Sequence, residues 1–141
     1  MDLGQARIIL VKPLTYMNRS GQILPHLLRR YSMAPERLVV VCDNMDMSPG
    51  DMRLKRGHST GGHNGIASVA RVLKEPFLRL YIGVGRPVES SVHEHVLGEP
   101  DFPDYEAIQG ACERAATCIQ DLGRGDVESV MNEYNRRKRG T

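Results

Sequence analysis

A glycine-rich loop at residues 56–65 brings together residue types that suit ligand binding. It holds four glycines and two histidines, and an apolar segment with helical spacing follows it. A loop that leads into a helix leaves unpaired N–H groups at the helix N-terminus, which suit an anionic or strongly polar ligand. Asn64 either caps this helix or points its amide toward a ligand. The Gly-Lys-Ser/Thr of a P-loop is absent, and a flexible connecting loop accounts for the composition equally well.

An acidic residue directly after an apolar run is the second candidate. Residues 38–42 predict a buried strand, and Asp43 follows it at once. Ligand sites of open α/β sheets lie at the carboxyl ends of the strands, where an Asp can orient a His or a metal. An Asx-turn that closes the strand is an equal alternative for Asp43.

Further polar and basic residues flank these two segments. Tyr16 and Asn18 supply a stacking ring and an amide, although ordinary loop residues have the same types. Arg53, Lys55 and Arg56 precede the glycine loop, and such a cluster can meet phosphates or form a solvated surface.

The pair His93 and His95 has a spacing that a metal could use, but no carboxylate or Cys cluster supports a site, so we interpret both as surface histidines. The basic tail at 136–139 has the same two interpretations as the other basic clusters.

Alternating strands and helices must position these residues. Helical periodicity and alternation of buried positions predict strands near 8–12, 38–42, 51–55 and 78–84, and helices near 22–32, 64–73, 104–122 and 127–136. Pro25 fits the first turn of its helix. We expect Gly83 and Gly85 to allow a close backbone approach or a bulge, Gly123 to end a helix and Asp126 to cap the next one. The expected class is α/β: one domain over residues 1–141 with a layered, mixed β-sheet flanked by helices.

Composition limits the classes of protein that remain. The net charge is +2, with 40% hydrophobic and 26% charged residues, which is ordinary for a soluble globular domain. No apolar run approaches the roughly 20 residues that cross a bilayer, and no signal peptide is recognisable. Three cysteines without zinc-type spacing fit a reduced, cytoplasmic setting. We therefore expect no membrane association.

Three ordered stretches together resemble bacterial-type peptidyl-tRNA hydrolase. They are Thr15-Tyr16-Met17-Asn18-Arg19-Ser20-Gly21, Asp43-Asn44-Met45-Asp46 with Pro49-Gly50, and Gly61-Gly62-His63-Asn64-Gly65. The later segments 79–87 and 96–98 also look like that family. The resemblance covers nearly the whole chain.

The resemblance implies hydrolysis, by activated water and without a metal or other cofactor, of the ester between a peptide and the 3′ end of tRNA. It implies a monomer whose partner is peptidyl-tRNA. Asp43 matches the carboxylate that orients a catalytic His, and Asn64 is the second residue that we expect to be catalytic. The residues matching substrate or tRNA contacts are Tyr16, Met17, Asn18, Gly62, His63 and Asn64, and we add Lys55 and Arg56 as phosphate contacts. Such a reaction needs a base near neutral pH and a donor for the oxyanion.

The family pattern also predicts what this sequence does not contain. The family begins with a strand, Gly-Asn-Pro-Gly and Arg-His-Asn, whose His is the general base, and none of these motifs is present. We therefore expect an N-terminally truncated member whose segment Ile8–Val11 forms an exposed edge strand open to association. The alternative is a tRNA- or RNA-binding module of the same fold without hydrolytic activity. A nucleophilic Ser hydrolase is set aside because Gly-x-Ser-x-Gly is absent. Whether the missing segment is a misassigned start or a real deletion, and which peptide or tRNA is preferred, stays open.

Overall fold

The computed structural model describes residues 2–3, 6–57, 63–86 and 102–136. The chain forms two compact units. Unit 1 comprises Met1–Ile9, Asp43–Leu54 and Tyr81–Thr141, and unit 2 comprises Leu10–Cys42 and Lys55–Leu80. Each strand of the main sheet has residues in both units. The expected single domain over residues 1–141 stays a prediction.

The main sheet is mixed, and its strands are ordered β3-β5-β4. The strands are β3 (Val39–Asn44), β4 (Met52–Gly57) and β5 (Phe77–Gly83). The N–H of Leu78 donates to Leu38 and that of Val84 to Asn44, so β3 and β5 run in the same direction. The N–H of Gly83 donates to Asp51, so β4 runs antiparallel to β5. The predicted α/β class is confirmed, and the middle strand β5 is nearly all buried.

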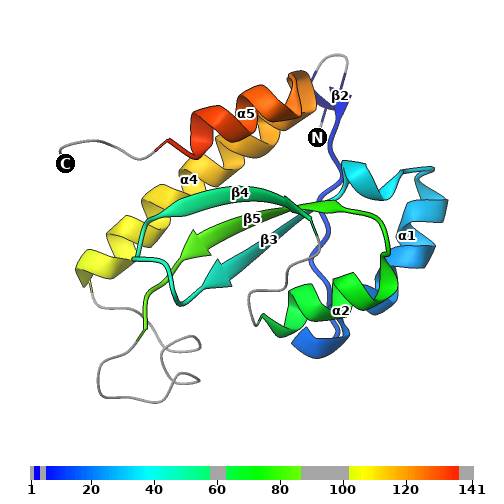
Figure 1. Cartoon of the computed structure of the whole chain (residues 1–141), viewed down its shortest axis with the longest axis horizontal. Helices are drawn as coiled ribbons and strands as arrows, with labels where there is room; N and C mark the ends of the chain where they lie inside the picture. The colour runs from blue at the N-terminus through cyan, green and yellow to red at the C-terminus, as the bar shows by residue number, and fades with distance from the viewer. Residues whose placement is uncertain (1, 4–5, 58–62, 87–101, 137–141) are drawn as a thin grey trace. The chain divides into compact units, whose positions relative to one another are not determined.

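In unit 1 a long helix, α4 (Phe102–Arg124), packs against α5 (Val127–Tyr134), which lies along it in Figure 1. The buried side of α4 repeats at helical spacing through Ala111, Ala115 and Cys118. The Asp126 side chain caps α5 by accepting from the N–H of Ser129 at 3.0 Å, as predicted. A short antiparallel pair, β1 (Asp2–Leu3) and β2 (Ala6–Arg7), also contacts α4.

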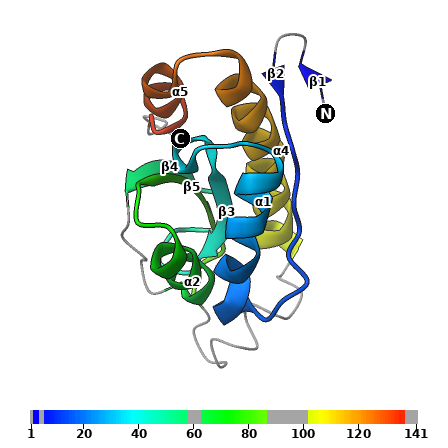
Figure 2. The same ribbon diagram turned by 90° about the vertical axis from the view of Figure 1, so that its right-hand side faces the viewer.

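In unit 2 a 3₁₀ helix, η1 (Met17–Ile23), continues directly into α1 (Leu24–Arg30). Pro25 lies in the first turn of α1, where its missing N–H is not needed, as predicted. A second 3₁₀ turn, η2 (Pro35–Arg37), precedes β3. The helix α2 (Asn64–Val72) contacts both η1 and α1, and Figure 2 shows α1 and α2 beside each other.

The predicted strand at 8–12 is wrong. Residues 8–14 have no regular secondary structure, and Leu10 and Val11 are 70% and 48% exposed. The expected edge strand at Ile8–Val11 is therefore not formed. An apolar, β-branched run becomes a strand only where a neighbouring strand accepts its backbone hydrogen bonds, and local sequence does not supply that neighbour.

Two glycine predictions had different outcomes. A Cβ at Gly83 would lie 2.2 Å from the carbonyl oxygen of Ser48, so the predicted close approach is confirmed. Gly123 does not end its helix, because α4 continues to Arg124 and the N–H of Gly125 still donates to Asp121 at 2.8 Å. One glycine in a long helix costs only about 1 kcal/mol relative to Ala, which tertiary packing overrides. Among the described residues, no helix combines the length and apolar character of a membrane span.

Candidate active site

The first group of predicted site residues is positioned by the packing of η1 against α2 in unit 2. The N–H of Gly21 donates to Ser68 Oγ at 2.8 Å, and a Cβ at Gly21 would lie 2.3 Å from the Ser68 carbonyl oxygen. The two backbones therefore approach as closely as only glycine allows. Arg71 of α2 adds a hydrogen bond at 3.2 Å to the carbonyl oxygen of Asn18.

This packing brings Met17 to the N-terminal end of α2. A Cβ at Gly65 would lie 2.8 Å from Met17 Sδ and 2.9 Å from His63 Cε1, so the three residues meet. The neighbouring Tyr16 is 80% exposed, and the side chains of Asn18 and Asn64 are exposed as well. The contact of Met17 with Gly65 and His63 thus joins two segments that lie nearly 50 residues apart in sequence.

The cap of α2 is His63, so the prediction that Asn64 caps this helix is wrong. Asn64 is the first helical residue, and Nδ1 of His63 accepts from the N–H groups of Gly65 at 3.0 Å and Ile66 at 3.3 Å. The imidazole reaches these N–H groups because His63 has an extended backbone, with φ −79° and ψ 122°. Two of the donors that an anion or oxyanion would use at this helix end are therefore occupied.

The same cap limits what His63 can do chemically. An imidazole nitrogen that accepts a hydrogen bond is unprotonated, and in the neutral ring the other nitrogen then carries the proton. In this arrangement Nε2 of His63 is a donor. The ring acts as a general base only if its tautomer changes and the cap is lost.

Asp43 lies in unit 1, half-buried near the carboxyl end of β3. The Asx-turn at this strand end belongs to its neighbour: Asn44 Oδ1 accepts from the N–H of Asp46 at 2.8 Å. Whether Asp43 also closes an Asx-turn stays open. The sequence also predicts that Tyr16, Asn18, Asp43 and Asn64 line one cleft at the carboxyl ends of the strands. Asp43 belongs to unit 1 and the other three to unit 2, so this stays a prediction.

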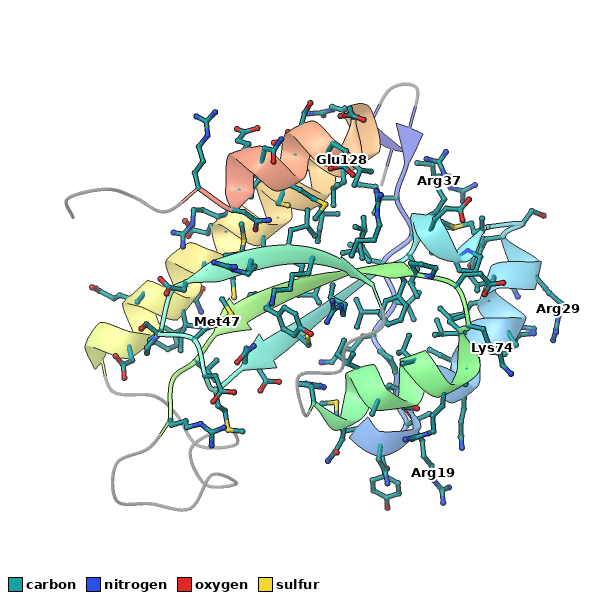
Figure 3. The ribbon with its side chains drawn as sticks, in the orientation of Figure 1. Arg19, Arg29, Arg37, Met47, Lys74 and Glu128 are labelled. Carbon is teal, nitrogen blue, oxygen red and sulfur yellow. The ribbon has the colours of Figure 1, made fainter. Side chains whose placement is uncertain are left out.

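Unit 1 also contains a hollow of about 440 Å³ that sequence reasoning missed. The loops that follow the parallel strands β3 and β5 line it, together with Asp104 of α4. Two of the lining residues form an ion pair: Nε of Arg86 lies at a distance of 2.7 Å from Oδ1 of Asp46. Both side chains are more than half exposed. Met47, labelled in Figure 3, lies in its wall. The position agrees with the rule that ligands bind beyond the carboxyl ends of parallel strands.

The remaining predicted residues are placed as follows. Lys55 and Arg56 are exposed on the half of β4 that belongs to unit 2, whereas Leu54 before them is fully buried. Gly62, like His58, His93 and His95, lies outside the described residues. Within the described part of the chain, no three His, Cys, Asp or Glu residues gather in a way that could hold a metal ion.

Comparison with known proteins connects this geometry to a family. The family model described as peptidyl-tRNA hydrolase matches residues 1–141. The peptidyl-tRNA hydrolase of Methylococcus capsulatus is 46% identical over 128 residues, which are 89% of this chain and 68% of that protein. That of Listeria welshimeri is 38% identical over 138 residues, 96% of this chain and 74% of that protein.

A solved structure agrees with the sequence comparison. The crystal structure of peptidyl-tRNA hydrolase from Acinetobacter baumannii is 38% identical to this chain, with a TM-score of 0.80. The match covers 89% of this chain but only 65% of the solved chain. The chain thus spans about two thirds of the length of this solved relative.

Proposed function

This chain belongs to the peptidyl-tRNA hydrolase family, and on that basis we propose that it acts on the ester between a peptide and the 3′ end of tRNA, with water as the nucleophile. The observation that carries the proposal is the contact of Met17 with Gly65 and His63. It joins two of the three family-like stretches at one exposed surface. Amides, an aromatic ring and a histidine N–H suit the sugar, base and ester of a tRNA end.

The proposed roles follow from the exposed groups. Tyr16 stacks on a base of the tRNA end, and the amides of Asn18 and Asn64 hydrogen-bond the substrate. Met17 forms an apolar wall, and Gly62 contributes to substrate binding as the resemblance implies. His63 contacts the substrate beside Asn64, while its Nδ1 holds the start of α2. Lys55 and Arg56 contribute phosphate contacts.

The general base is a separate part of the proposal. The Nδ1 cap argues against His63 in this role. A carboxylate is in general a weak base for activating water, so Asp43 is better suited to orient and stabilise an imidazolium. As the resemblance implies, we place the general base on a His in the part of the family's sequence that this chain does not match. The enzyme would be a cytoplasmic monomer.

The His63 cap also favours a second candidate, a tRNA-binding module that does not cleave the ester. In this candidate the same surface grips the tRNA end, and His63 serves only the helix and the contact with the substrate. The two candidates differ in one measurable quantity, the rate of ester cleavage at saturating tRNA.

The test is release of the blocked amino acid from N-blocked aminoacyl-tRNA. We expect the 141-residue chain to cleave about 10²–10⁴-fold more slowly than a chimera that carries the preceding segment of the Methylococcus relative, since general-base catalysis is worth about that much. Asp43→Ala should lower the rate of the chimera. No gain of activity in a chimera that still binds tRNA would favour the binding module.

Two substitutions of His63 separate its roles. His63→Asn keeps a side-chain oxygen that caps a helix well, whereas His63→Ala removes the cap and costs about 0.5–2 kcal/mol of stability. We expect the chimera with His63→Asn to keep the stability of the parent and most of its rate. Full-speed cleavage by the unextended chain, lost in both variants, would make His63 the base and overturn the assignment.

A further inference from the structure

Charge is distributed very unevenly between the two units. Counted from the sequence, unit 2 carries ten Lys and Arg residues against two acidic ones, whereas unit 1 carries nine basic and fifteen acidic residues. No Asp or Glu occurs anywhere between residues 3 and 35. The net charge of +2 therefore conceals a strongly basic unit 2.

Part of this charge forms an ordered stripe along η1 and α1. Residues that repeat every three positions in a 3₁₀ helix, or every three to four in an α-helix, share one face. The positions that follow this spacing and are all exposed are Arg19, Gln22, His26, Arg29 and Arg30. We call these five residues the η1–α1 stripe. Figure 3 shows Arg19 and Arg29 projecting away from the ribbon of unit 2.

Neighbouring residues add to the positive potential of the stripe. Arg71 reaches from α2 to the carbonyl oxygen of Asn18, directly beside Arg19. The Arg30 guanidinium lies 5.7 Å from the centre of the Tyr31 ring, a cation–π contact that keeps it at the helix end. Like charges at helical spacing repel one another. An anionic partner would relieve this repulsion.

We propose that the η1–α1 stripe binds the sugar–phosphate backbone of RNA. Protein–RNA contacts of this kind are polar and strongly basic, whereas the centre of a protein–protein interface is apolar and rich in aromatic residues. The stripe consists of guanidinium, imidazole and amide groups. From the rise of the two helix types it is about 18 Å long, enough to follow several phosphates of one strand.

The stripe is distinct from the ester site. It begins at Arg19, next to Asn18, and extends along η1 and α1 to Arg30, and it needs neither a 3′ end nor an ester. The inference shares its ligand, tRNA, with the proposed function but does not depend on hydrolysis. It predicts that the η1–α1 stripe binds the part of the RNA that lies outside the 3′ end.

The experiment measures binding of a blunt RNA hairpin, without a single-stranded 3′ end or ester, as a function of salt. Each lost phosphate contact should lower the slope of log K against log salt by about 0.7–0.9. For the variant Arg29→Gln/Arg30→Gln we therefore expect weaker binding and a slope smaller by about 1.4–1.8. Arg29→Lys/Arg30→Lys keeps the charge and should keep most of the slope. Arg7→Gln/Arg124→Gln removes two exposed charges from unit 1 and is the matched control.

The results distinguish an RNA-binding stripe from a general effect of charge and from a surface for an acidic protein. An unchanged slope in the Arg29/Arg30 variant, or an equal loss in the control, would overturn the proposal. The proposal would also be overturned if the Arg29→Gln/Arg30→Gln variant lost affinity for poly-glutamate but not for the hairpin, because the partner would then be an acidic protein. Lys55→Gln/Arg56→Gln, assayed on the same hairpin, tells whether the proposed phosphate contacts of β4 belong to the same surface. Failure of ester hydrolysis would leave these binding results unaffected.

Discussion

Glycines hold two parts of this protein closer than any other residue would allow. Gly21 lies against the backbone of Ser68, and Gly65 lies between Met17 and His63. The first of these contacts is with backbone atoms, which cannot rotate away as a flexible side chain can. The position of Tyr16, Met17 and the neighbouring amide therefore depends on the absence of one Cβ atom.

Gly21→Ala should destabilise the protein by at least about 1–3 kcal/mol, the usual cost of overpacking, because the new methyl group meets the Ser68 carbonyl. Gly110→Ala is the matched control: it lies inside α4, and the nearest atom to its added Cβ is the mobile Arg114 Nη1 at 3.6 Å. That change should stabilise by about 0.5–1 kcal/mol. Urea unfolding of both variants measures the two effects. Equal stabilities would show that η1 moves away from α2 at little cost.

At the scale of elements, the junction of α4 and α5 holds a small group of ionisable side chains. The Tyr134 hydroxyl donates to Asp121 Oδ2 at 2.5 Å, and Asn135 exchanges two hydrogen bonds of 2.8 Å with the backbone of Leu54. Cys118 is fully buried below them. Burial, and then the charges of Asp121 and Glu133, raise the pKa of the Cys118 thiol from 9.0 to about 11. Burial and the Asp121 hydrogen bond also raise the pKa of Tyr134.

These shifts predict a loss of stability in mild alkali. Between pH 9 and 11 the unfolded thiol releases its proton while the folded thiol keeps it, so the free energy of unfolding falls as the pH rises. For Cys118 the fall should be about 2–3 kcal/mol. Denaturant unfolding at pH 8 and pH 10.5 measures it. Cys118→Ala should flatten the pH dependence, and Tyr134→Phe should remove a further part above pH 10. A wild-type protein with constant stability across this range would contradict the assignment.

At the scale of the whole molecule, the three cysteines differ in exposure: two are buried and one is exposed. Cys42 and Cys118 are 9% and 0% exposed, while Cys112 is exposed on α4. With a thiol reagent at neutral pH, the native chain should therefore label once rapidly, and twice more only after denaturation. Cys112→Ser should remove the rapid phase alone. Two rapid thiols in the native protein would show that one of the buried positions opens readily.

Much of the fold could be predicted because its signals are local. Apolar periodicity predicts strands β3, β4 and β5 and helices α2, α4 and α5 to within a few residues, and residue type predicts Pro25 in the first turn of α1 and Asp126 as the cap of α5. The family could also be predicted from local signals, because short motifs in a given order can be recognised without the fold. The match over residues 1–141 confirms this prediction.

Only the tertiary structure decided the features that depend on partners distant in sequence. Ile8–Val11 has strand-like residues, but a strand also needs a neighbour to bond with. Asn64 suits a cap by its residue type, but the cap is the imidazole of His63, whose backbone is extended. The contact of Met17 with Gly65 and the hollow at Asp46 and Arg86 join segments about 40–50 residues apart. Sequence determined which groups are present, and packing determined which of them meet, because contact energy depends on distance in space and not along the chain.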